Sequence, residues 1–193
     1  MRTINIDLLD LRTLDKAIKQ IEQYQKRLRK LIPEFLKRCA ETVRDMANNI
    51  ISGLPYESDI ISGLQNSWKT ETADDGQVVT LINDYDKAVY IEFGTGLVGK
   101  IKSHKEADEA GYQYDVNGHG AKGWRFIHSV DEPLDVPDRY YSDTKSIDHT
   151  GMWFSVHTTG APATMFLYQA ATEFAERKVY ERVWKEFASK RKL

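Results

Sequence analysis

The first quarter of the chain carries a hydrophobic repeat with alternating steps of three and four residues. The repeat runs through Leu11, Leu14, Ile18, Ile21, Gln25, Leu28 and Ile32. This spacing is typical of a helix with an apolar seam, in which Gln25 is the one polar member. Pro33 follows the repeat, and because proline lacks a backbone N–H, we expect a kink or a short break there.

The apolar stripe resumes after Pro33 and ends before Gly53 and Pro55. Its second part consists of Leu36, Cys39, Val43, Met46 and Ile50. Such a helix can lie on the sheet of its own chain, or it can also contact a helix of a neighbouring subunit. The stripe is longer than a small sheet easily covers, so both interpretations stay open. In the second interpretation, the subunit contacts are Leu14, Ile18, Ile21 and Leu28.

After Pro55 the pattern changes to one that predicts strands. Residues 67–72 and 77–82 are rich in β-forming side chains, and the Asp75-Gly76 dipeptide between them predicts a tight hairpin turn. Residues 87–93 also alternate, with Val89, Ile91 and Phe93 on one face of a third strand. Three strands joined by short turns indicate an antiparallel meander.

Residues 97–150 show little periodicity, and we predict a long loop or insertion with a short strand at 124–128. A further strand is predicted at 152–157, followed by a turn at 159–162. The apolar face of one final helix carries Leu167, Ala170, Ala171, Phe174, Val179, Val183 and Phe187.

The predicted fold class is therefore α+β, in a single domain comprising residues 1–193. A long N-terminal helix, kinked near Pro33, and a C-terminal helix pack on an antiparallel sheet of about four to five strands.

The composition favours a protein of the reducing cytoplasm. Lys and Arg total 27 against 29 Asp and Glu, a net charge of −2, which argues against a dedicated nucleic-acid binder. The single cysteine, Cys39, excludes an intrachain disulfide. The first residues are interrupted by acids and do not resemble a secretory leader. No apolar run approaches the roughly 20 residues that cross a bilayer, so we expect a soluble protein without membrane contact.

Residues 94–99 read GTGLVG, the G-x-G-x-x-G pattern of a dinucleotide-binding turn. That turn must open a helix inside a parallel βαβ unit, but residues 100–109 lack a helical period and the preceding strand belongs to a meander. Lys100 is not followed by Ser or Thr, as a phosphate loop requires. We therefore predict no nucleotide cofactor. Gly94 and Gly96 are instead expected to provide positive φ or a close backbone approach at the end of a strand.

No other motif indicates an enzyme or a metal site. The five histidines are His104, His119, His128, His149 and His157. None forms a metal-binding motif, and most are expected in solvated loops. Residues 115–119 only faintly resemble a calcium loop, because the later glutamate is missing. We predict neither catalytic activity, nor a cofactor, nor a bound metal.

Two charged features have alternative interpretations. Glu92 can cap nearby backbone N–H groups, pair with an arginine of a neighbouring subunit, or face water, and the first is favoured. A basic cluster on the first helix (Lys26, Arg27, Arg29 and Lys30) and the basic tail at 185–192 can contact DNA phosphates. A solvated helix face and a frayed tail are the simpler interpretation.

Three segments resemble a known family. Residues 62–67 read SGLQNS, residues 88–95 read AVYIEFGT and residues 160–170 read GAPATMFLYQA. In this order, after a long amphipathic helix, they resemble the gene-product-ten-like tail-component family of long-tailed bacteriophages. The resemblance rests on a strand and turn signature (Tyr90, Glu92, Phe93, Gly94, Thr95 and Gly96) and on the start of the last helix (Pro162, Phe166, Leu167 and Ala170). Met165 and Gln169 stand where the family usually has proline.

The resemblance implies a virion structural protein of the head-to-tail region, either a neck or a tail-completion component. Proteins of this kind have an α+β fold and form rings around the DNA channel, and no catalytic role comes with the resemblance. The implied partners are further copies of the chain, head-completion and tail proteins, and passing DNA. The implied location is the virion, after assembly in the host cytoplasm. The alternatives are a non-specific DNA-binding module and, less favoured, a nucleotide- or metal-dependent enzyme.

Overall fold

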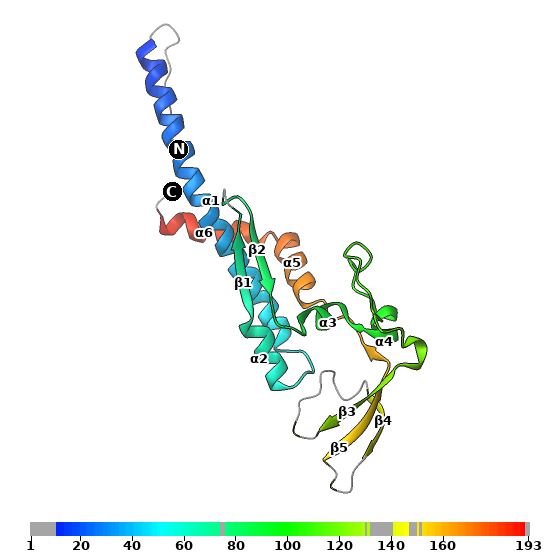
Figure 1. Cartoon of the computed structure of the whole chain (residues 1–193). Helices are drawn as coiled ribbons and strands as arrows, with labels where there is room; N and C mark the ends of the chain where they lie inside the picture. The colour runs from blue at the N-terminus through cyan, green and yellow to red at the C-terminus, as the bar shows by residue number, and fades with distance from the viewer. Residues whose placement is uncertain are drawn as a thin grey trace. The chain divides into compact units, whose positions relative to one another are not determined.

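The computed structural model describes residues 11–73, 76–129, 131, 141–146, 150 and 152–191 (Figure 1). The chain groups into two compact units. The first unit comprises residues 1–41, 70–80 and 180–193, and the second comprises residues 42–69 and 81–179. The prediction of a single domain stays a prediction, and the two units are described separately below.

Helix α1 (Leu11–Ile51) contributes residues to both units and confirms the predicted long N-terminal helix. The helix continues through Pro33, so the expected break is absent. Just after Pro33, the Phe35 ring lies 5.2 Å from the Trp184 ring and 5.9 Å from the Phe187 ring, both on α6 (Val179–Lys190). These aromatic contacts hold the turn after the proline against α6, and they help the helix to tolerate the missing hydrogen bond.

The two strands of the first predicted hairpin are confirmed, and Asp75 of the predicted turn lies outside the described residues. Strands β1 (Trp68–Thr72) and β2 (Val79–Asn83) form a two-stranded sheet. At one end the Ala73 N–H donates to the Val78 carbonyl at 3.0 Å. At the other end the Asp84 N–H donates to the Ser67 carbonyl at 2.9 Å, so backbone bonds close the pair at both ends.

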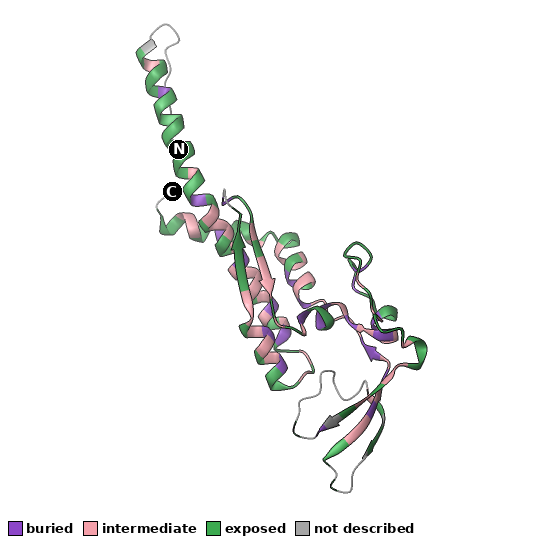
Figure 2. Cartoon of the chain, viewed as in Figure 1, coloured by how far each residue is buried: buried purple, intermediate pink, exposed green. Residues whose placement is uncertain are grey.

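The core of the second unit is built almost entirely from helices. Helix α1 meets α2 (Ser58–Asn66), α3 (Ala88–Phe93) and α5 (Phe166–Glu176) there. The buried side chains are those of Ala47, Ile51, Ile60, Leu64, Ala88, Ile91, Phe166 and Ala170. Figure 2 shows buried positions on all four helices. The predicted positions Phe166 and Ala170 are thus core residues, and Leu167 packs partly buried against the same core.

Residues 88–93 form helix α3, so the predicted third strand is wrong. Ala88, Ile91 and Glu92 are buried. Ile91 and Glu92 lie three and four residues after Ala88, which places all three on one face of a helix. Val89 and Tyr90 are 50% and 52% exposed, whereas a strand would have buried Val89 together with Ile91. Residues 62–66, which belong to the first segment of the family resemblance, form the end of helix α2.

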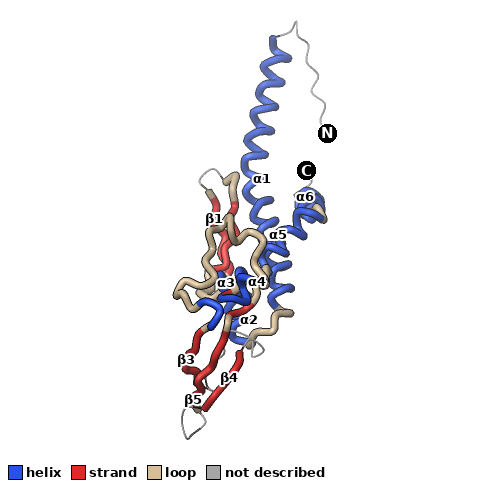
Figure 3. Tube along the Cα trace, turned by 90° about the vertical axis from the view of Figure 1, so that its right-hand side faces the viewer, coloured by secondary structure: helices blue, strands red, loops and turns tan. Residues whose placement is uncertain are grey.

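A separate three-stranded antiparallel sheet lies within the second unit (Figure 3). Its order is β3 (Trp124–Ser129), β5 (Trp153–Thr158) and β4 (Tyr141–Ser146). Phe126 pairs with Val156, and β4 has an irregularity between Ser142 and Lys145. The strands predicted at 124–128 and 152–157 are confirmed. The segment 97–150 also contains most of α4 (Gly96–Ile101) and a 3₁₀ turn, η1 (Gly120–Lys122).

The predicted final helix is two helices, α5 and α6. Between them Lys178 has a φ of 50°, in the left-handed region that ends a right-handed helix. Neither glycine nor proline marks this break, so the sequence pattern gave no sign of it. The α+β fold class is confirmed, but the strands of the described residues form two separate sheets instead of one.

Candidate functional site

Two of the sequence segments that carry the family resemblance meet in the second unit. We call residues 90–96 the signature turn and residues 159–168 the α5 start. Thr95 and Gly96 form antiparallel bridges with Ala161 and Gly160. The Ala161 N–H also donates to the Thr95 hydroxyl at 3.2 Å. The structure thus brings together two segments that lie more than 60 residues apart in the sequence.

The carboxylate of Glu92 caps the N-terminus of α5. Its Oε2 accepts the Leu167 N–H at 3.0 Å, and its Oε1 accepts the Tyr168 N–H at 2.9 Å. The first N–H groups of a helix have no partner within the helix. A negative charge at this end also interacts favourably with the positive end of the helix dipole. Met165, the residue before α5, makes no side-chain cap. Of the roles considered for Glu92, the structure shows the capping of backbone N–H groups.

The α5 start caps α3 in return. The carbonyls of Ile91 and Glu92, at the end of α3, accept the N–H groups of Thr164 and Met165, both at 3.1 Å. The Thr164 hydroxyl adds a bond of 2.8 Å to the Ile91 carbonyl. Each helix therefore satisfies terminal backbone groups of the other, which fixes α5 on α3.

A buried histidine supports the capping carboxylate. His104 is 4% exposed, and its Nε2 lies 3.2 Å from Glu92 Oε1. Its Nδ1 accepts the Glu106 N–H at 3.0 Å and therefore carries no proton. The proton of the neutral ring is consequently on Nε2, which donates to Glu92. The expectation of a solvated histidine is wrong for His104.

Aromatic rings surround this carboxylate and imidazole. The Phe93 ring lies 4.3 Å from the His104 ring and 4.7 Å from the Tyr112 ring, and the Tyr168 ring meets His104 edge-on at 5.2 Å. The Tyr112 hydroxyl donates to the Gly94 carbonyl at 2.7 Å. Burial, together with the nearby Tyr90 and Tyr114, raises the pKa of Tyr112 to about 12. Tyr112 therefore remains a hydrogen-bond donor throughout the physiological pH range.

The glycines of the turn allow two backbones to touch. Gly94 has a φ of 82°, and a Cβ built on it would lie 2.5 Å from the Ala163 nitrogen and 2.7 Å from the Ala161 oxygen. Gly96 has a φ of 59°. The predicted positive φ and close approach are confirmed, although the bend follows a helix and not a strand.

Two backbone N–H groups in the first turn of α4, which follows this bend, already donate to carbonyls of the same chain. The Gly96 N–H donates to the Tyr114 carbonyl at 2.7 Å, and the Val98 N–H donates to the Thr159 carbonyl at 3.2 Å. The element before the glycines is a helix, whereas a dinucleotide turn follows a parallel strand. The G-x-G-x-x-G pattern therefore serves backbone packing in this fold.

His119 and His157 make separate local contacts. The backbone N–H groups of Gly120 and His119 donate to the Asp115 carboxylate at 2.6 Å and 2.9 Å. These two hydrogen bonds lower the pKa of the Asp115 carboxyl. His157 bonds the Ser142 hydroxyl at 2.8 Å through Nδ1. His128 lies in β3, and His149 lies outside the described residues. Within the described part of the chain, no group of three or more His, Cys, Asp or Glu residues could hold a metal ion.

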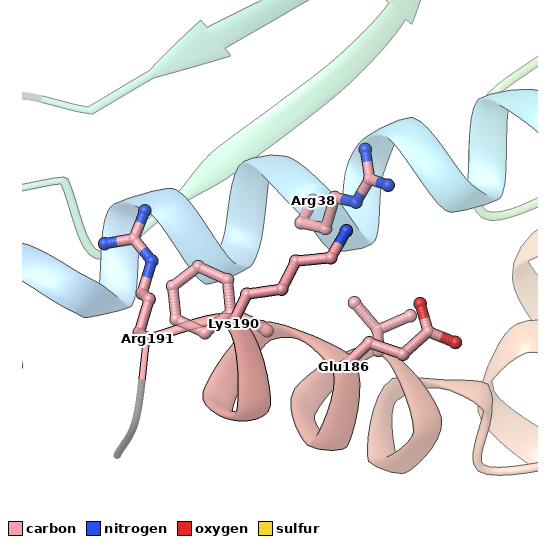
Figure 4. A pocket seen from close by; sticks show the side chains of 6 residues that line it. Arg38, Glu186, Lys190 and Arg191 are labelled. Carbon is pink, nitrogen blue, oxygen red and sulfur yellow. The ribbon is translucent and has the colours of Figure 1, made fainter.

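The first unit has a hollow of about 380 Å³ between α1 and α6 (Figure 4). Its lining residues are Arg38, Val183, Glu186, Phe187, Lys190 and Arg191. The basic character of this lining is offset, because Arg38 pairs with Glu41 at 2.7 Å and Arg191 pairs with Glu34. The hollow is therefore not a concentrated anion site.

The predicted subunit and DNA contacts lie on the part of α1 that belongs to the first unit. Leu14, Ile18 and Ile21 are exposed by 37%, 47% and 46%, and Leu28 is half-buried. The basic residues Lys26, Arg27, Arg29 and Lys30 are all exposed. None of the helices in the described part of the chain is long and apolar enough to span a membrane.

Comparison with known proteins bears on the first half of the chain, including most of the signature turn. Residues 15–94 match the family described as "Bacteriophage HK97-gp10, putative tail-component". This segment of the chain is HK97-gp10-like. The resemblance predicted from the sequence is confirmed over this range, which is less than half of the chain and ends within the signature turn, at Gly94. The α5 start lies outside it. Neither the curated proteins nor the solved structures gave a match.

Proposed function

We propose that this chain is a structural component of the head-to-tail region of a long-tailed bacteriophage, a neck or tail-completion protein. The HK97-gp10-like segment supports a tail component. In this proposal the chain self-assembles into a ring and docks on the neighbouring head-completion and tail proteins. It acts in the virion after assembly in the host cytoplasm, and its role requires no catalysis.

The observation that carries the proposed self-association is the exposed seam of α1. Leu14, Ile18, Ile21 and Ile32 are between 37% and 47% exposed and recur at seam spacing. A soluble chain that presents several large aliphatic side chains in one line is suited to pairing with another helix. Covering the exposed part of one such side chain stabilises an interface by roughly 1 kcal/mol, since more than half of the side chain is already buried.

Replacing Ile18 with aspartate is expected to weaken self-association at least about tenfold, because a charge would replace an apolar side chain in the interface. The measurement is the concentration dependence of the solution mass by multi-angle light scattering. Gln23→Asp is the matched control, since Gln23 is exposed on the opposite side of the same helix. Equal dissociation of both variants would show that the seam is not the contact.

A second candidate function is non-specific contact with DNA, which a basic face of α1 favours. Between residues 11 and 32, the face opposite the seam carries exposed cations and no acid; these are Arg12, Lys16, Lys19, Lys26, Arg27 and Lys30. Adjacent phosphates along a duplex attract such a row without reading sequence.

Duplex DNA is expected to bind this face weakly, with an affinity that falls steeply as salt rises. If four cations contact phosphates, the logarithm of the affinity falls with a slope of about −3.6 against the logarithm of salt concentration. Fluorescence anisotropy with a labelled duplex measures this slope. The double variant Lys26→Glu, Lys30→Glu should abolish binding, and unchanged binding would rule out this face.

A further inference from the structure

The two flanks of the α1 seam differ in charge. The residues that directly follow Leu14, Ile21 and Leu28 are charged; they are Asp15, Glu22 and Arg29. The residues that directly precede Ile18, Gln25 and Ile32 are uncharged; they are Ala17, Tyr24 and Leu31. All three charged side chains are exposed, whereas Ala17 and Leu31 are buried. The seam therefore has one charged edge and one uncharged edge.

This asymmetry bears on how two copies of the helix can pair. In a parallel pair, the charged edge of one helix faces the uncharged edge of the other, so no ion pairs form across the seam. In an antiparallel pair, equivalent edges face each other. The charged edge then meets its own copy, and it contains both signs, because Asp15 and Glu22 precede Arg29.

We propose that the α1 seam pairs antiparallel with the α1 seam of a second copy of this chain, about a two-fold axis near Gln23. The inference rests on the proposed self-association and specifies its partner and geometry. Leu14 packs against Ile32 of the second copy, Ile18 against Leu28, and Ile21 against Gln25. Because the axis repeats each contact, every seam residue from 14 to 32 has a partner.

The charged edge is largely complementary in this register. Asp15 lies opposite Arg29 of the second copy, and the axis gives this pair twice. Glu22 lies at the axis and meets its own copy, which is the one unfavourable contact. Moving the register by one heptad in one direction places Asp15 opposite Glu22, so two repulsions replace two attractions.

A shift in the other direction pairs the exposed residues with side chains that are already packed. Ile18 would meet Phe35, which packs on Trp184 and Phe187, and Leu14 would meet the half-buried Cys39. The register centred near Gln23 confines the contacts to residues 14–32, where every seam residue is exposed except the half-buried Leu28.

A two-fold contact closes on itself and cannot propagate into a ring of identically oriented subunits. The pair therefore covers the seam in the free protein. A ring of such subunits needs another surface, or an opening of this pair when the chain docks on its virion partners.

Spin-label distances test the orientation without touching the seam. In a Cys39→Ser background, single cysteines replace Lys16, Gln23 or Lys30, which all lie on the face opposite the seam. Double electron–electron resonance then measures the distance between the two copies. We expect the shortest distance at position 23 and longer, equal distances at 16 and 30. In an antiparallel pair, position 16 of one copy lies 14 residues along the helix, or about 21 Å, from position 16 of the other copy, and the same holds for position 30.

Equal distances at all three positions would show parallel pairing and overturn the inference, while self-association itself would stand. Equal short distances at 23 and 30 would overturn the register. An absence of coupling in a protein that light scattering shows to be monomeric would overturn the proposed self-association as well.

Charge exchange provides a second measurement. Asp15→Arg is expected to weaken pairing about three- to tenfold, since each exposed ion pair contributes modestly and two are lost. Adding Arg29→Asp to the same chain should restore pairing. If Asp15→Arg weakens pairing and Arg29→Asp does not restore it, the antiparallel pairing of the two charged edges is contradicted.

Discussion

Replacing Gly94 by alanine is expected to destabilise the second unit by about 4 kcal/mol. The φ of 82° with ψ of 175° at this residue belongs to a region that essentially only glycine occupies, and this strain costs about 1–3 kcal/mol. The added methyl group would also meet the Ala163 nitrogen at 2.5 Å, and overpacking of this kind costs about 1–3 kcal/mol more. The Ala163 nitrogen and the nearby Ala161 oxygen are backbone atoms, so no side-chain rotation relieves the contact.

Gly111 provides the matched control for this prediction. Its φ of 64° is also positive, but a Cβ there would meet nothing within 4 Å. Gly111→Ala therefore reports the conformational strain alone, at about 1 kcal/mol. Urea unfolding followed by tryptophan fluorescence measures both variants, since Trp68, Trp124 and Trp153 lie in the second unit. A Gly94→Ala variant no less stable than Gly111→Ala would refute the close backbone approach.

Replacing Glu92 by alanine is expected to cost about 3 kcal/mol and to loosen the start of α5. The carboxylate accepts hydrogen bonds from Leu167, Tyr168 and His104, and a buried donor left without a partner costs about 1–3 kcal/mol. Hydrogen exchange should report the loss directly, as faster exchange of the Leu167 and Tyr168 amides. Glu92→Gln keeps the shape and one accepting oxygen, so we expect an intermediate effect.

Glu106 is the control for Glu92. It neighbours His104 in sequence, but its side chain is exposed, so Glu106→Ala should change the free energy of unfolding by less than about 0.5 kcal/mol. Unchanged exchange of the α5 amides in Glu92→Ala would contradict the capping role.

The sequence predicted the elements whose residue pattern is strongly periodic or rich in β-forming side chains. The seam of α1 repeats over more than ten turns, and the strands at 68–72, 79–83, 124–129 and 153–158 alternate or are rich in β-forming residues. Of the kink or short break expected at Pro33, the break is wrong, because tertiary contacts of Phe35 support the helix around the proline. The glycines at 94 and 96 were correctly assigned positive φ, since few other roles suit paired glycines in a tight bend.

Helix α3 could not be predicted by hydrophobic pattern. Val89, Ile91 and Phe93 alternate as in a strand, while the buried helical face includes a carboxylate, Glu92, which a hydrophobic pattern places on the surface. The partners that make this burial tolerable are distant in sequence. Leu167 is 75 residues away, and His104 lies in a segment without periodicity.

The family resemblance pointed to the right segments for the site, but not to their contact. The signature turn and the α5 start were noted as separate motifs, and only the structure shows that one caps the other. His104 was missed altogether, because no spacing rule links it to Glu92 and its neighbours in sequence are polar.

Sedimentation equilibrium of the unaltered chain over a concentration series tests the central claim most directly, namely that the exposed α1 seam joins copies of this protein. The account predicts a weight-average mass that rises with concentration to that of two chains or more. A mass of one chain at every concentration would contradict it.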